Sequence, residues 1–180
     1  FLWQVRHGAT THFLLGSVHL LPNDALPLPT ALEDAYEKTG GIILETDLAA
    51  LEDPQVQADL LSAAQAPKGL EALIGRTAYR RLNEQLRAMD IPVETICAPY
   101  KAWFCAMTLE ALNFTRSGFD PANGIDQQFY SQAQRDGKTI GWLEAPSDHL
   151  ALFTQMPDAM GAAFLDSTLD ELRDVKQTPK

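Results

Sequence analysis

A short apolar segment bounded by glycines constrains the fold of this chain more than any other feature. Ile42-Ile43-Leu44 follows Gly40-Gly41 and leads directly into Glu45. A continuous apolar run of this length is typical of a strand that is buried on both faces, as in a parallel sheet covered by helices. The sequence therefore predicts an α/β fold with a central mixed, mostly parallel sheet flanked by helices.

Segments on either side of this strand fit the same architecture. Residues 2–6 and 12–18 are rich in strand-forming residues and flank a polar run, which predicts a β-hairpin at the start of the fold. Thr30 and Glu33 have the spacing of a capping box at the start of a helix. Apolar spacing, glycines and prolines predict further strands at 93–97 and 138–143, and helices at 31–38, 78–89, 101–112, 125–136 and 148–175, the last with a break near Pro157.

The composition is that of a folded, acidic protein. The 180 residues include 14 Lys+Arg and 24 Asp+Glu, which gives a formal net charge of −10, and 46% of the residues are apolar. A chain with this charge and no basic cluster repels the phosphates of nucleic acids, so we expect no nucleic-acid partner. No apolar stretch approaches the roughly 18–20 residues that a membrane-spanning helix needs. The length alone is that of a single domain.

The two cysteines, Cys97 and Cys105, do not have the spacing of a metal ribbon, and two are too few for a disulfide scaffold. We expect both to be unpaired residues that pack in the core. Cys105 falls in the most apolar predicted helix, where a thiol stays neutral, so a cysteine nucleophile is disfavoured.

Three polar side chains follow predicted strands. His19 follows the second strand, Glu45 the third and Glu144 the strand at 138–143. In open α/β sheets, ligands bind beyond the carboxyl ends of the strands. Imidazole and carboxylate together suit a divalent ion such as Mn, Co, Zn or Fe, and two or three such ligands leave positions for water or substrate. The three residues therefore predict a catalytic metal site.

Each of these residues also has a structural interpretation. His19 fits a hydrogen-bonded structural histidine, Glu45 fits a buried ion pair with Arg or Lys, and Glu144 fits the cap of the helix that follows it. His149 lies one turn into that helix and is a further candidate ligand at the same sheet edge. His7 and His12 flank the hairpin turn, where solvent exposure is expected. Neither a Gly-rich phosphate loop nor a Gly-x-Ser-x-Gly elbow occurs, which disfavours nucleotide binding and an α/β serine hydrolase.

Taken together, these segments resemble one family. The residues that carry the resemblance are 2–5, Gly16-Ser17-Val18-His19-Leu20-Leu21-Pro22, Pro27-Leu28-Pro29, Leu44-Glu45-Thr46-Asp47, Lys101-Ala102-Trp103, Gly124-Ile125-Asp126, Phe129, Ala133, Gly137-Lys138 and Leu143-Glu144. In this order they resemble the TraB/PrgY/GumN family, to which the Tiki proteases are related. The resemblance implies a metal-dependent hydrolase related in fold to erythromycin esterases and ChaN-like proteins.

The resemblance also implies particular site residues. Gly16 and His19 match the first Gly-x-x-His motif of the family, and Glu45 matches its glutamate, with Mn or Co as the implied ion and Zn as a possible one. The family's usual Glu-Thr followed by Glu-Gln is Glu144-Ala145 and Asp148-His149 here. The second Gly-x-x-His, expected about a hundred residues further on, is not in this sequence. We therefore expect residues 1–180 to form one TraB/GumN-like domain that is incomplete at its C-terminus.

Two functional hypotheses follow. In the first, His19 and Glu45 hold a divalent ion that activates water in a peptidase-like hydrolase, and Glu144 or Asp126 orients ligands or accepts a proton. In the second, the chain is a non-catalytic regulatory protein that binds a peptide or glycan at a degenerate metal site. The resemblance implies an extracytoplasmic location, periplasmic or secreted, and a peptide or small-molecule substrate.

Overall fold

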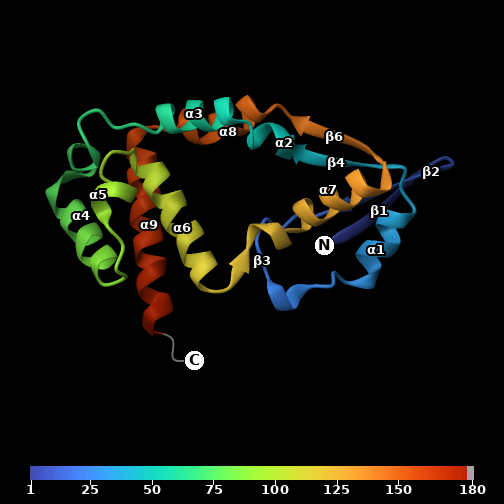
Figure 1. Ribbon diagram of the computed structural model, residues 1–180, viewed down its shortest axis with the longest axis horizontal. Coiled ribbons are helices and arrows are strands. Elements are labelled where there is room, and N and C mark those ends of the chain that lie inside the picture. Colours follow the sequence, from blue (N-terminus) through green and yellow to red (C-terminus); the bar gives the residue numbers. More distant parts are fainter. Residues whose placement is uncertain (178–180) are drawn as a thin grey trace. The chain divides into compact units, whose positions relative to one another are not determined.

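The structure is a computed structural model that describes residues 1–177, with side chains as far as residue 172 (Figure 1). The chain forms two compact units. The first contains Phe1–Leu48 and Phe114–Ala145, and the second contains Ala49–Asn113 and the residues from Pro146 onward. Each unit is described separately below.

The first unit contains every strand found in residues 1–177, so it defines the α/β character of the fold. Its elements are β1 (Leu2–His7), β2 (Thr10–Leu15), β3 (Leu21–Pro22), η1 (Asn23–Ala25), α1 (Thr30–Glu37), β4 (Gly41–Thr46), β5 (Phe119–Asp120), η2 (Pro121–Asn123), α7 (Ile125–Asp136) and β6 (Thr139–Glu144). The α/β class and the N-terminal hairpin predicted from the sequence are confirmed.

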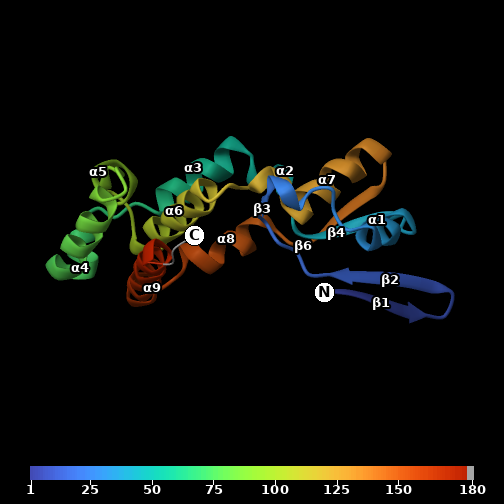
Figure 2. The same ribbon diagram turned by 90° about the horizontal axis from the view of Figure 1, so that it is seen from below.

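The strands of this unit pair two by two. β1 and β2 form the antiparallel hairpin, with Trp3 opposite Leu14 (Figure 2). The short strands β3 and β5 are also antiparallel, and they join segments that lie about a hundred residues apart in the chain. β4 and β6 are parallel, with Ile43 opposite Gly141. This parallel pair carries two of the three residues predicted to form a site.

The core of the first unit lies between the helices α1 and α7 and one face of the β4–β6 pair. Ile42 and Ile140 pack from the strands against a buried cluster of Leu28, Leu32, Tyr36, Ile125, Phe129 and Ala133. The Tyr36 and Phe129 rings stack with their centroids 5.3 Å apart. α7 ends at Gly137, which adopts the left-handed conformation (φ 64°) that favours glycine at helix ends. Gly137 therefore sets the point at which α7 ends and the chain turns back into β6.

The other face of the β4–β6 pair is exposed, which corrects the prediction that Ile42-Ile43-Leu44 is buried on both faces. Ile43 is 70% exposed and Leu143 is 77% exposed. Ile42, in contrast, packs against the core. Alternate side chains of a strand point to opposite faces, so a helix on one face covers every second residue only. An apolar strand can be buried on both faces, but its composition does not show whether a second layer of helices covers it.

The helix start at Thr30 also differs from the prediction. Pro29 occupies the N-cap position of α1, and no side chain caps the helix. Thr30 is therefore the first helical residue rather than the capping residue, and the Thr30–Glu33 capping box does not form. The carbonyl of Pro29 accepts from the N–H of Leu32 at 2.8 Å, so a backbone group meets one of the free donors of the first turn.

The second unit is helical. Its elements are α3 (Pro54–Ala63), α4 (Leu70–Arg87), α5 (Val93–Ile96), α8 (Pro146–Thr154) and α9 (Asp158–Gln177), and two helices cross its boundaries, α2 (Leu48–Leu51) and α6 (Ala102–Arg116). The predicted helices at 78–89, 101–112 and 148–175 correspond to α4, α6 and α8–α9. The strand predicted at 93–97 is wrong, because these residues form α5. Pro92 precedes this helix in an extended conformation, and its carbonyl accepts from the N–H of Ile96.

Cys97 and Cys105 form a disulfide, which corrects the prediction that they are unpaired. Their Cα atoms are 4.8 Å apart, and both residues are fully buried in the core of the second unit. A tight turn follows α5, with the N–H of Tyr100 donating to the carbonyl of Cys97. The N–H of Lys101 then donates to Ala64, and α6 begins. This reversal brings the first turn of α6 next to the end of α5, a proximity that cysteine spacing does not show.

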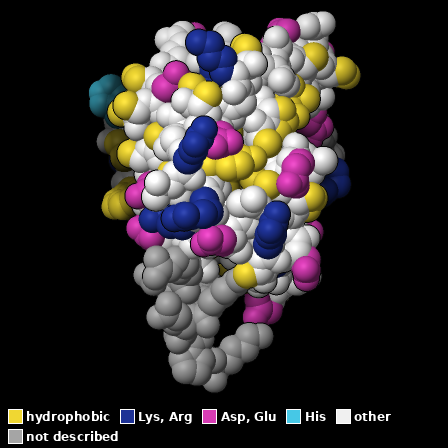
Figure 3. Space-filling model, turned by 90° about the vertical axis from the view of Figure 1, so that its left-hand side faces the viewer, with side chains coloured by type: hydrophobic (Ala, Val, Ile, Leu, Met, Phe, Trp, Pro, Cys, Tyr) yellow, Lys and Arg dark blue, Asp and Glu magenta, His cyan; other side chains and the backbone are white. Residues whose placement is uncertain are grey.

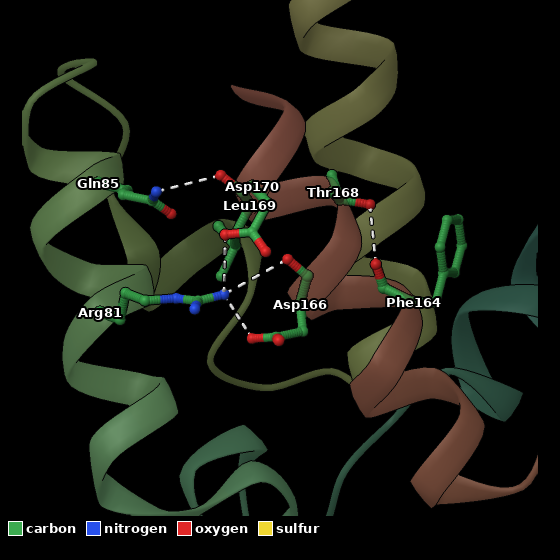
Figure 4. A network of polar contacts seen from close by, with 7 residues as sticks. All are labelled: Arg81, Gln85, Phe164, Asp166, Thr168, Leu169 and Asp170. Atoms are coloured by element: carbon green, nitrogen blue, oxygen red, sulfur yellow. Dashed lines mark hydrogen bonds and ion pairs between the residues drawn. The ribbon is translucent and has the colours of Figure 1, made fainter. Parts of the chain in front are cut away.

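A polar network joins α4 and α9 (Figure 4). The Arg81 guanidinium donates to the side chain and the backbone carbonyl of Asp166, and it lies 3.8 Å from the Asp170 carboxylate. Gln85 donates to the carbonyl of Leu169, 3.1 Å away. On the side of the molecule shown in Figure 3, Lys and Arg side chains alternate with Asp and Glu.

Candidate functional site

Two carboxylates lie at the same end of the parallel β4–β6 pair. Glu45 is the second-last residue of β4, and Glu144 is the last residue of β6. Oxygen atoms of the two carboxylates lie within 4.8 Å of one another. The buried Thr46 donates its hydroxyl hydrogen to the carbonyl of Glu144 at 3.3 Å, which ties the two strand ends together. Because the strands are parallel, both strand ends meet at one edge, as expected from the sequence.

His19 approaches the Glu45 carboxylate from a third segment. It follows β2 in the loop that leads to β3, and its Nε2 is 4.0 Å from an Oε of Glu45. Its Nδ1 forms a 2.8 Å hydrogen bond with Asp126 of α7. The imidazole is 60% exposed and the Asp126 side chain only 17%. One ring nitrogen is thus held from the protein side, while the other faces Glu45.

Asp126 determines which ring nitrogen of neutral His19 carries the proton. A carboxylate only accepts hydrogen bonds, so Nδ1 must carry the hydrogen that it shares with Asp126. Nε2 of the neutral imidazole then has a free lone pair on the side of Glu45. A carboxylate behind a histidine in this way is the usual arrangement of a metal-ligating imidazole.

The contact between His19 and Asp126 shifts the pKa values of both side chains. The hydrogen bond with Asp126 raises the pKa of His19; burial opposes this rise, while the negative charges of Asp126 and Glu45 add to it. Burial acts to raise the pKa of Asp126, but the hydrogen bond and charge of His19 and nearby backbone N–H groups outweigh it and hold the pKa below its ordinary value. Asp126 therefore stays ionised behind the imidazole at neutral pH.

The geometry can be tested against a bound ion. Ligand atoms at about 2.0–2.2 Å from one ion with tetrahedral angles lie about 3.4 Å apart. The 4.0 Å between His19 Nε2 and Glu45 is slightly longer, and side-chain rotation of either exposed residue would close it. The donor set, one imidazole nitrogen and carboxylate oxygens, suits Mn, Co or Zn. These residues therefore fit a divalent metal.

The other residues singled out from the sequence belong to the N-terminal segment and to the second unit. Gly16 donates its N–H to the carbonyl of Phe1 and extends the pairing of the hairpin. His7 and His12 are exposed on the hairpin, as expected. His149 and Asp148 belong to α8 in the second unit. The first unit itself thus brings together His19, Glu45, Glu144 and Asp126.

Sequence reasoning did not identify Thr46 and Gly124 as contributors to this site. Thr46 ties the strand ends of Glu45 and Glu144, and it is one of few buried polar residues. Gly124 packs against the backbone of His19. A hydroxyl residue directly after Glu45 is a usable signal, whereas the contact between positions 19 and 124 depends on tertiary structure.

Comparisons with known proteins agree with the resemblance. The model of the TraB/PrgY/gumN family matches residues 1–180. The chain is 31% identical over 159 residues to YbaP of Escherichia coli (strain K12), described as an uncharacterized protein, a match that covers 88% of this chain and 57% of YbaP. YbaP of Shigella flexneri is 30% identical over 156 residues, which cover 87% of this chain and 56% of that protein.

The chain spans about half the length of these curated relatives. No solved structure matches it. Among the described residues, no helix is long and apolar enough to cross a membrane.

Proposed function

Because this chain belongs to the TraB/PrgY/gumN family, we propose that it carries the metal-binding part of a metal-dependent, peptidase-like hydrolase. One observation carries the proposal: His19 is held at Nδ1 by Asp126 while its Nε2 faces Glu45. At neutral pH the uncharged imidazole keeps the Nδ1 hydrogen on Asp126, so its free Nε2 lone pair lies on the side of the Glu45 carboxylate. A histidine that ligates a metal commonly has this arrangement, with one nitrogen held by a carboxylate and the other directed to the ion.

In this proposal each residue has a distinct task. His19 Nε2 and a Glu45 oxygen would hold the ion. The bound ion would polarise a carbonyl and lower the pKa of a water molecule. Glu144, within 4.8 Å of Glu45, would orient the ligands or accept a proton. Asp126 would keep the Nδ1 proton in place, so that Nε2 stays available as a ligand.

Mn or Co is the proposed ion, with Zn as the alternative, and the proposed substrates are peptides or small molecules. We also propose an extracytoplasmic location. The buried Cys97–Cys105 disulfide supports it, because disulfides form and persist mainly in oxidising compartments.

A second candidate function is non-catalytic binding of a peptide or glycan. It is favoured by the 4.0 Å between His19 and Glu45, which exceeds the separation of two ligands on one tetrahedral ion. The two functions differ in whether the ligand survives intact and whether a chelator matters.

The test is metal binding followed by peptide cleavage. Titration of the apoprotein with Mn²⁺, Co²⁺ or Zn²⁺, followed calorimetrically, should show binding that His19→Ala and Glu45→Gln both reduce at least tenfold. His12→Ala, which removes an exposed hairpin histidine, is the matched control and should bind as wild type does. Failure of the wild-type chain to bind Mn²⁺, Co²⁺ or Zn²⁺ would refute the hydrolase proposal. Binding of an intact peptide that is insensitive to a chelator would favour the second function.

A further inference from the structure

The loop that carries His19 is held by a segment that lies a hundred residues later in the chain. Residues 21–22 pair with residues 119–120 as the β3–β5 sheet (Figure 1). The N–H of Ile125 donates to the carbonyl of Val18 at 2.9 Å. The buried Asn123 donates through its side-chain amide to the carbonyl of Leu21 at 3.3 Å and to the side chain of Asn23 at 2.9 Å. These contacts bracket His19 on both sides.

Gly124 lies at the centre of this contact, where a side chain has no room. A Cβ at position 124 would overlap the carbonyl oxygen of His19 and lie 2.8 Å from its carbonyl carbon. Both neighbours are backbone atoms, so rotation of a side chain cannot relieve the overlap. The backbone angles of Gly124 are φ −52° and ψ 143°, which any residue adopts. The requirement for glycine is therefore one of space and not of backbone conformation.

This close approach also sets the position of Asp126. Gly124 is the N-cap residue of α7, and Asp126 lies in the first turn of that helix. Any displacement of residue 124 from the backbone of His19 carries the first turn of α7 with it. The 2.8 Å hydrogen bond between Asp126 and His19 Nδ1 would then lengthen or break.

We propose that Gly124 is a positioning residue of the site: its missing side chain lets α7 start against the backbone of His19, which places Asp126 on Nδ1 and leaves Nε2 directed to Glu45. The role of Gly124 in metal binding rests on the proposed function, whereas its effect on the position of Asp126 does not depend on any reaction. Its action is indirect, through Asp126 and the imidazole.

The test compares Gly124→Ala with a glycine that is equally crowded elsewhere. At Gly41 a Cβ would lie 2.5 Å from the carbonyl oxygen of Thr139, at the opposite end of β4 from the site, so Gly41→Ala is the matched control. The first readout is the tautomer of His19 in the metal-free protein, from long-range ¹H–¹⁵N correlation at a pH where the ring is neutral. Wild type and Gly41→Ala should show the Nδ1–H form, whereas Gly124→Ala should show a mixture with Nε2–H.

The second readout is the affinity for Mn²⁺, which Gly124→Ala should reduce about tenfold or more while Gly41→Ala stays within twofold of wild type. If Gly124→Ala does not fold, Asn123→Ser replaces it in the test. Asn123→Ser removes the amide contacts without adding volume, and it should shift the tautomer in the same direction. An unchanged His19 tautomer in folded Gly124→Ala would overturn the inference. If Gly124→Ala does not fold, an unchanged tautomer in Asn123→Ser would overturn it. An equal change in Gly41→Ala would also overturn it. If wild type binds none of Mn²⁺, Co²⁺ and Zn²⁺, the proposed function is refuted instead, and the tautomer comparison still decides the positioning role.

Discussion

Replacing Asp126 with asparagine should lower the pKa of His19 and remove a pH-dependent part of the protein's stability. The hydrogen bond with Asp126 is the largest cause of the raised pKa of His19, and the charge of the same carboxylate adds to it. Asparagine keeps the size of the side chain and removes the charge. Burial, which lowers the pKa, is then opposed mainly by the charge of Glu45, whose carboxylate is 4.0 Å away.

The sign of the stability change follows from these two shifts. Because the pKa of His19 is raised in the folded state, the pair stabilises the fold fully at pH values below about 6.5, the ordinary pKa of histidine. This contribution disappears as the pH rises through the folded-state pKa of His19. The pKa of Asp126 is lowered in the folded state, to below the ordinary value of about 3.9. The pair is therefore also lost at acid pH, as the pH falls through this lowered pKa. A hydrogen bond to a charged group contributes about 1.5–3 kcal/mol. His19 is 60% exposed, so screening reduces this to about 1 kcal/mol near pH 5.

Urea unfolding at pH 5 and pH 8, together with an NMR titration of His19, measures both effects. The Asp126→Asn variant should be about 1 kcal/mol less stable than wild type at pH 5, with a smaller difference at pH 8. Asp34→Asn, which removes one exposed carboxylate from α1, is the control and should leave the His19 titration unchanged. An equal His19 pKa in wild type and Asp126→Asn would refute the assignment of this pair.

Three further variants test the packing that supports the site and the second unit. Tyr36→Phe removes the 2.8 Å hydrogen bond to Asp136 and should cost about 1 kcal/mol in the free energy of unfolding by urea. Arg81→Ala breaks the α4–α9 ion pairs; because the arginine is 35% exposed, the loss should be about 1 kcal/mol and should shrink in 1 M salt, and a salt-independent loss would contradict the ion-pair account. Cys97→Ser with Cys105→Ser opens a loop with a sequence separation of 8 and should cost about 2.5 kcal/mol; unfolding curves of the wild type that coincide with and without reductant would argue against the disulfide.

The strand-end residues of the site could be predicted from local sequence. The apolar runs before Glu45 and Glu144 define two strands, and parallel pairing brings their ends to one edge whatever the distance along the chain. The partner of His19 could not be derived in this way. Asp126 is 107 residues away, and no periodicity links the two positions. Only the packing of the helix start at Gly124 on the His19 loop brings them together.

The local errors have local causes. Pro29 and Pro92 each set the start of a helix: one displaced the expected capping residue, and the other turned a β-branched segment into α5. The Cys97–Cys105 pair depends on a chain reversal between α5 and α6 that residue spacing does not encode. The burial of Ile43 depends on whether a second layer covers the sheet, which the composition of the strand cannot determine.

The bare face of the β4–β6 pair has a consequence for how the protein behaves as a solute. Two large apolar side chains, 70% and 77% exposed, attract one another between molecules, while a net charge of −10 keeps the molecules apart. Repulsion between surface charges reaches only about 8 Å at physiological ionic strength and about 3 Å in 1 M salt, whereas apolar attraction does not weaken. Solubility should therefore fall as salt is added or as the pH approaches 4.7, and variants with a polar residue in place of Ile43 or Leu143 should resist this precipitation.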